Sequence, residues 1–139
     1  MKTAVVFYSF TGMTKKFAED EARRDNAELI EIKEKKPYSK PGAYIFGSLH
    51  ARGRKKAVIE PGTADFDSFD RILVAVPLWA GFPAPPFNNI LELLPGNTEI
   101  ELFITSASGN SGGSKEKTIS FAASKNIRIV KYQDIKTTV

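Results

Sequence analysis

The fold class is determined by the stretch Ala4-Val5-Val6-Phe7-Tyr8-Ser9-Phe10-Thr11-Gly12-Met13-Thr14. Its first five residues form an apolar run rich in β-formers, and a strand that is apolar on both faces is expected to be buried. The run ends in a loop of hydroxyl-bearing residues with one glycine. A short polar helix over 15–25 is expected next, with Thr14 as its N-cap.

The same alternation of apolar run, loop and helix continues along the chain. Five apolar residues in succession at 72–76 favour a central strand, whereas the charged flanks of 28–33 suit an edge strand. The expected strands are 4–8, 28–33, 70–76, 100–105 and 127–132, and the later expected helices are a short one at 43–49, one from Pro85-Pro86 to Pro95-Gly96, and one capped by Ser114. This order predicts an α/β domain over 1–139, with a parallel sheet and helices on both faces.

Composition excludes several kinds of chemistry. The chain has 139 residues, no cysteine and one histidine, His50. Disulfides, thiolate catalysis, Cys–zinc sites and multi-His metal sites are therefore excluded, and we expect His50 to be a surface residue. No run approaches the roughly 20 apolar residues that span a bilayer, and no targeting segment is visible. We expect a cytoplasmic protein with no membrane partner.

The positive charge is concentrated in one segment. Eight of the 20 Lys and Arg residues lie in 33–56 against one acidic residue, so this segment carries +7 and the rest of the chain −3. The segment could dock an acidic redox partner or a nicotinamide dinucleotide phosphate. Its interleaved aromatic residues would also suit single-stranded nucleic acid, which we consider an unlikely partner. For most of these charges we favour a third interpretation, a solvated face of a short helix.

Three loops follow the most buried predicted strands, and each offers a different chemistry. The loop Ser9–Thr14 presents three hydroxyls, N–H groups and a helix N-terminus, a combination that suits a phosphate. It lacks the G-x-x-x-x-G-K-[ST] pattern of a P-loop, and no G-x-G occurs in the chain. The alternative is an ordinary helix-capping turn.

The second and third loops suit a planar ligand. Trp79, in the loop that begins at Pro77, could stack on a flat ring such as an isoalloxazine, or pack as a partly buried anchor. The loop Ser106–Gly113 consists of small residues that let N–H groups approach a ligand edge, unless it is simply a flexible surface loop. In parallel sheets, ligands bind beyond the carboxyl ends of the strands.

These three stretches together resemble the flavodoxin family. Val5–Thr14 is similar to the family's first strand and phosphate loop, whose pattern is close to apolar-x-Y-S-x-T-G-x-T. Val76–Gly81 resembles the second FMN loop, and Thr105–Gly109 resembles the third. The resemblance implies a flavodoxin-like, doubly wound sheet of five parallel strands in the order 2-1-3-4-5, with FMN as the cofactor.

The resemblance also implies the binding residues, with no catalytic residue and no metal. The FMN phosphate would lie in the first loop, Trp79 would flank the ring, and the third loop would border its other side and its pyrimidine edge. The implied FMN-binding residues are Ser9, Phe10, Thr11, Gly12, Met13, Thr14, Pro77, Leu78, Trp79, Ala80, Gly81, Ser106, Ala107, Ser108 and Gly109.

Two departures from the family bear on function. No aromatic residue occurs between Thr105 and Gly113, which leaves one ring face open to a substrate or to NAD(P)H. The chain is basic, whereas electron-carrying flavodoxins are usually acidic. We expect an FMN-binding redox protein that carries electrons between partner proteins. The alternatives are a small FMN-dependent NAD(P)H or quinone reductase, and a binding module that has lost FMN and docks an anionic partner through 33–56.

Overall fold

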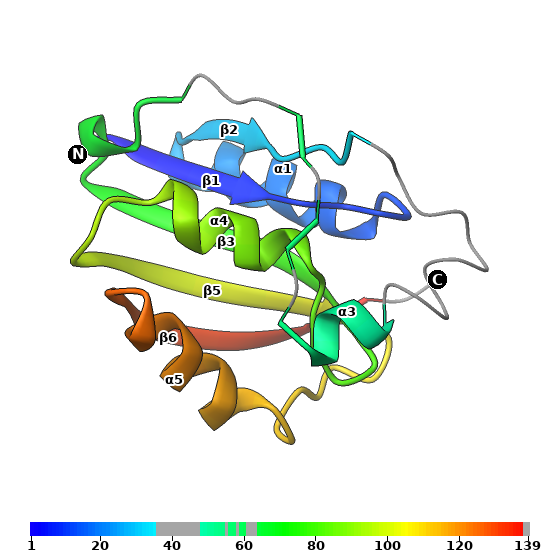
Figure 1. Ribbon diagram of the computed structural model, residues 1–139. Helices are drawn as coiled ribbons and strands as arrows, with labels where there is room; N and C mark the ends of the chain where they lie inside the picture. The colour runs from blue at the N-terminus through cyan, green and yellow to red at the C-terminus, as the bar shows by residue number, and fades with distance from the viewer. Residues whose placement is uncertain (36–47, 55, 58, 61–63, 138–139) are drawn as a thin grey trace.

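A parallel sheet lies at the centre of the protein (Figure 1). The computed structural model describes residues 1–35, 48–54, 56–57, 59–60 and 64–137. Five parallel strands follow the order β2-β1-β3-β5-β6, which confirms the predicted flavodoxin-like α/β topology. Their bounds are β1 Thr3–Phe7, β2 Glu28–Glu31, β3 Arg71–Trp79, β5 Thr98–Ser106 and β6 Ile127–Lys136.

Helices cover both faces of the sheet, as predicted. One face carries α1 (Met13–Asp25), and the other carries α4 (Pro86–Leu93) and α5 (Lys115–Ser124), with the short α3 (Ser48–Arg52) near the carboxyl ends of the strands (Figure 1). A single turn of 3₁₀ helix, η2 (Phe66–Ser68), precedes β3. Most of the helix predicted at 43–49 lies outside the described residues. No helix in the described part of the chain is long and apolar enough to cross a bilayer.

Alternating side chains of the strands form two cores. In β1, Val5 and Phe7 pack toward α1, whereas Ala4 and Val6 pack toward α4 and α5. The apolar residues 72–76 of β3 are all buried, as expected for a central strand. Three of the four residues of β2 are exposed, which confirms its predicted edge position.

Strand β3 is longer than predicted. A loop was expected from Pro77, but Leu78 and Trp79 continue the strand and pair antiparallel with β4 (Phe82–Pro83). The turn residues Ala80 and Gly81 have φ of 50° and 86°. Two consecutive positive φ values are typical of the tight hairpin turns that match strand twist. The second predicted loop is therefore the tip of a rigid hairpin.

The prediction of Thr14 as a helix N-cap is wrong. Helix α1 begins two residues earlier, with Gly12 as its cap at φ 97°. Thr14 lies inside the first turn and is 2% exposed, and its Oγ1 lies 2.7 Å from Oγ1 of Thr105 on β5. A long-range contact thus overrides the local capping preference of threonine.

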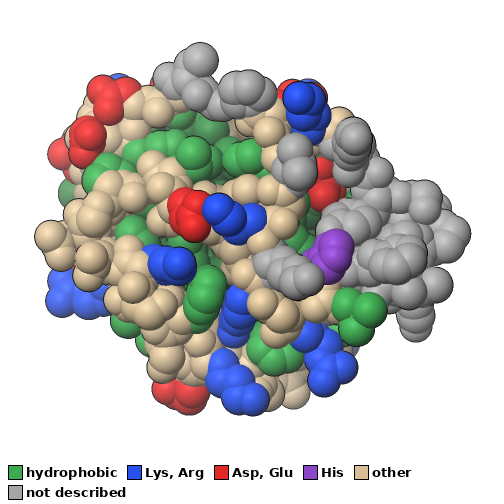
Figure 2. Space-filling model, in the orientation of Figure 1, with side chains coloured by type: hydrophobic (Ala, Val, Ile, Leu, Met, Phe, Trp, Pro, Cys, Tyr) green, Lys and Arg blue, Asp and Glu red, His purple; other side chains and the backbone are tan. Residues whose placement is uncertain are grey.

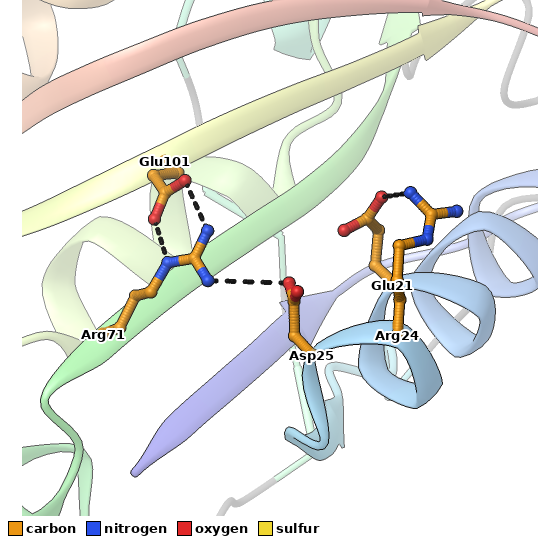
Figure 3. Close-up of polar contacts among 5 residues, drawn as sticks. All are labelled: Glu21, Arg24, Asp25, Arg71 and Glu101. Atoms are coloured by element: carbon orange, nitrogen blue, oxygen red, sulfur yellow. Dashed lines mark hydrogen bonds and ion pairs between the residues drawn. The ribbon is translucent and has the colours of Figure 1, made fainter. Parts of the chain in front are cut away.

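An ion cluster lies on the α1 side of the sheet, between β3, β5 and the end of α1. Arg71 donates to both carboxylate oxygens of Glu101, with Nη2–Oε1 at 2.9 Å, and its Nη1 lies 3.6 Å from Asp25 (Figure 3). The hydrogen bonds from Arg71 lower the pKa of Glu101. This bidentate geometry is the arrangement in which an ion pair contributes to stability.

Replacing Arg71 by Met is expected to lower the free energy of unfolding by about 1 kcal/mol at pH 7, after allowing for solvent screening. Because the pKa of Glu101 is depressed in the folded protein, its stabilisation is present above the unfolded pKa and is lost as pH falls through the folded pKa. Chemical unfolding of wild type and variant at pH 7 and at acid pH should therefore show a difference that shrinks on acidification.

The matched control is Arg24→Met. Arg24 pairs with Glu21 across one helical turn and its side chain is 69% exposed, so its loss should change stability by less than about 0.5 kcal/mol (Figure 3). Equal losses in the two variants, or a loss in Arg71→Met that persists at acid pH, would contradict this assignment.

Candidate functional site

The three predicted loops meet at the carboxyl edge of the sheet. They follow β1, β3 and β5, which are neighbours in the strand order. Phe10 of the first loop contacts Trp79 edge-on, with ring centroids 5.5 Å apart, and Thr14 meets Thr105 at the end of β5. The structure therefore joins the first loop to each of the other two.

The first loop presents donors at the start of α1. Gly12 donates its N–H to Ser9 Oγ at 3.1 Å, and Lys16 donates to Gly12 O, which closes the first helical bond. The N–H groups of the first helical turn have no carbonyl acceptor within the helix. Thr11 and Gly12 are exposed, whereas Ser9, Phe10 and Met13 are half-buried. An anion placed here would meet neutral donors and the positive end of the helix dipole.

Thr14 takes a different position from the one its sequence pattern indicates. Its hydroxyl shares one hydrogen bond with Thr105, and either oxygen can be the donor. When Thr105 donates, the Thr14 proton is available for a second acceptor. Thr14 therefore links the first and third loops and can still donate to a ligand in one of two hydroxyl orientations.

Trp79 is held by two aromatic rings beside the turn of the hairpin. Tyr8 and Phe10 both meet it edge-on, with interplanar angles of 76° and 86°. The indole is half-buried and packs against the main core, while Ala80 and Gly81 at the hairpin tip are exposed. Trp79 is thus an anchored residue, as one of the two interpretations proposed, and a rigidly held ring is also suited to orienting a planar ligand. Pro77 and Leu78 below it are half-buried.

The third loop is ordered by its own hydrogen bonds. Ser106 Oγ accepts from Gly109 N–H at 2.9 Å, and Asn110 Oδ1 accepts from Gly112 N–H at 2.8 Å. Strand β6 anchors the far end of the loop, because Ser111 N–H donates to Asp134 at 3.1 Å. Ala107, Ser108 and Asn110 remain exposed with small side chains. The loop offers an accessible surface of small side chains and backbone.

A buried carboxyl lies beside the first loop, and sequence reasoning missed it. Glu34 counted only as the lone acid of the basic segment, but it is 7% exposed and accepts a hydrogen bond from the Tyr8 hydroxyl. Burial raises the pKa of Glu34, and the Tyr8 hydrogen bond partly opposes that rise. Tyr8 also contacts Trp79, so this carboxyl supports the wall of the site. Nothing in the local sequence signals its burial.

The described residues of the basic segment 33–56 differ in exposure and in their contacts. Lys33, Lys35 and Arg52 are exposed, and Lys56 pairs with Glu92 at 2.8 Å on the surface. Arg54 is an exception to the solvated face that we favour for most of these charges, because its guanidinium packs between aromatic rings. Predicted as a surface residue, His50 is half-buried. Lys36, Lys40 and Lys55 lie outside the described residues.

The three candidate loops contain no charged side chain. The loops 9–14, 77–81 and 106–109 hold only neutral residues. Within the residues that the structure describes, no group of three or more His, Asp or Glu side chains could hold a metal ion. Hydroxyls, backbone N–H groups and an aromatic ring are the chemistry that the site offers.

Comparison with known proteins supports the same fold. No protein-family model and no curated protein sequence matches the chain. Among solved structures, a flavoprotein in complex with FMN from Lactobacillus acidophilus is similar over 94% of this chain and 91% of its own, with 26% identity and a TM-score of 0.78.

Two further structures share the fold at lower sequence identity. One from Bacteroides eggerthii, provisionally assigned as a flavoprotein, has a TM-score of 0.83 at 18% identity and covers 99% of this chain and 89% of its own. Another from Bacteroides uniformis, assigned in the same way, has a TM-score of 0.77 at 19% identity and covers 98% and 92%. The chain therefore has a flavodoxin-like α/β fold along nearly its whole length.

Proposed function

We propose that this chain is an FMN-binding, flavodoxin-like redox protein that carries electrons between partner proteins. The observation that carries the proposal is the meeting of the three loops through Phe10–Trp79 and Thr14–Thr105. The fold is shared with a flavoprotein that was crystallised with FMN. When bound, FMN supplies the electron-transfer chemistry, and the protein supplies binding and orientation.

The residues of the site fit the three parts of FMN. Thr11 and the N–H groups at the start of α1 would bind the phosphate through neutral donors. Trp79, fixed by Tyr8 and Phe10, would orient the ring. The small residues 106–109 would let backbone groups reach the ring edge. None of these loops contains an acidic, basic or histidine side chain, so their contribution would be binding and orientation.

Exposed cationic side chains support an acidic redox partner. Lys33, Lys35 and Arg52 of the basic segment are exposed. Figure 2 shows further Lys and Arg side chains in the lower part of the view, around α5 and α3. Positive charge of this kind increases the association rate with a negatively charged partner. The proposal places the protein in the cytoplasm, where nicotinamide nucleotides supply reducing equivalents.

A small FMN-dependent NAD(P)H or quinone reductase is the second candidate. The third loop favours it, because Ala107, Ser108 and Asn110 are exposed and small. They would leave one ring face open to NAD(P)H or to a quinone. A carrier needs only an exposed ring edge, whereas a reductase needs room for a substrate to stack.

Flavin titration followed by turnover assays tests the proposal. Purified protein is expected to be yellow, or to quench the fluorescence of added FMN at a one-to-one stoichiometry. Steady oxidation of NADH or NADPH with a quinone would then identify a reductase, and reduction only through a separate reductase protein would identify a carrier. A protein that leaves FMN fluorescence unchanged and binds polyanions instead would contradict both and favour a binding module.

A further inference from the structure

Arg54, just beyond the end of α3, has a guanidinium that packs between two aromatic rings. Its Cζ lies 4.9 Å from the ring centroid of Phe82 and 5.2 Å from that of Phe121. Its Nη2 donates to Thr118 Oγ1 at 3.0 Å. A guanidinium between two aromatic faces makes cation–π contacts with both.

These contacts reach the supports of two different loops. Phe82 is paired with Trp79 in the hairpin that carries the second loop, and α3 packs against β4 of that hairpin. Phe121 and the fully buried Thr118 lie on α5, the helix that follows the third loop. Arg54 therefore bridges the second loop and the element that continues the third.

Several unfavourable contributions to the free energy of folding accompany these contacts of Arg54. Arg54 has φ 54°, a conformation that costs energy in any residue with a side chain. Burial lowers the pKa of its guanidinium, and its Nη1 is buried without a hydrogen-bond partner. No acidic side chain within the described residues forms an ion pair with it. An arginine in such a position is held there by the two rings and Thr118.

We propose that Arg54 is a positioning residue that fixes the separation of the second and third loops, and with it the width of the slot for the isoalloxazine ring. This inference rests on the proposed function. The guanidinium is suited to the task because it is flat and can stack on both rings while it donates in its own plane. A lysine ammonium cannot make all three contacts at once.

The test compares FMN with riboflavin, which has the ring but no phosphate, in Arg54→Met. Both affinities are expected to fall about tenfold, so their ratio stays constant, because the contacts of Arg54 reach the hairpin of the second loop and α5. Arg54→Lys should recover part of the loss. The emission of Trp79, the only tryptophan, should shift in the flavin-free variant as the hairpin moves.

The matched control is Lys56→Met, which removes one charge from the same segment at an exposed ion pair. It should leave both flavin affinities within twofold. Wild type is titrated first, because a wild type that binds neither flavin refutes the proposed function itself. With binding established, unchanged affinities in a folded Arg54→Met, or a fall for FMN alone, would overturn the role of Arg54.

A second variant tests the proposal in case Arg54→Met does not fold. Thr118→Val keeps the volume of the buried side chain and removes only the oxygen that accepts from Arg54. It is expected to lower both flavin affinities about threefold. Equal affinities in Thr118→Val and wild type would then overturn the proposal.

Discussion

Replacing Thr11 by Glu is expected to lower the affinity for FMN at least 100-fold and to leave the affinity for riboflavin nearly unchanged. Thr11 is exposed at the start of α1, so a longer side chain there disturbs no packing. A carboxylate about 4 Å from a phosphate costs about 4 kcal/mol at the effective dielectric of a protein surface, more than a 100-fold loss requires. Fluorescence titration with both flavins measures the two affinities.

The control is Lys16→Glu, which changes the net charge by more than Thr11→Glu does. Lys16 is exposed on α1, beyond the phosphate loop. It should lower FMN affinity only a few-fold, and raised salt should abolish that effect because surface charges are screened. If the two variants weaken FMN equally, or if Thr11→Glu weakens riboflavin as much as FMN, the phosphate does not lie at Thr11.

The sheet and the placement of the site follow from the sequence for a simple reason. Each central strand contains a run of apolar residues, so its existence and burial need no knowledge of its neighbours. The loops after such strands must share one edge of a parallel sheet, whatever their composition. The meeting of the loops after β1, β3 and β5 was therefore predictable, and the structure confirms it.

The features that the sequence did not predict depend on partners distant in sequence. The local sequence indicates that Thr14 is an N-cap. Its hydroxyl instead bonds inside the protein to Thr105, which lies 91 residues away. In the same way, the buried Glu34 depends on Tyr8 as its hydrogen-bond donor. The packing of Arg54 depends on the rings of Phe82 and Phe121. The sequence shows that these two side chains are ionisable. Whether such a side chain is buried depends on which hydrogen-bonding or charged groups the fold places beside it.

The hairpin at Trp79 was missed because its turn is unusual. Ala80-Gly81 lacks the Asn-Gly or Asp-Gly signal of a two-residue turn, and two prolines lie within three residues of it. Pro83 is nevertheless tolerated, since β4 is a two-residue strand whose outer side needs no N–H donor. The consequence for function is that Trp79 lies on a paired strand and not on a mobile loop.

Replacing Gly109 by Val is expected to destabilise the protein by about 2–4 kcal/mol and to lower the affinity for both flavins at least tenfold. Gly109 has φ 69°, where a β-branched residue is strained. A Cβ at this position would lie 2.9 Å from Lys136 Cβ and 3.4 Å from Lys136 Cα. The Lys136 backbone belongs to β6, so the loop must move away from the strand.

That movement would spread through the third loop. Gly109 donates to Ser106 Oγ, and Thr137 N–H donates to Ser106 O, so displacing residue 109 breaks the junction between the loop and the end of β6. Gly113→Val is the matched control, because Gly113 lies in the same stretch with open space around it and no positive φ. Chemical unfolding and flavin titration of both variants separate the cases. If Gly109→Val binds flavin as Gly113→Val does, the third loop does not border the ring, and only its structural role remains.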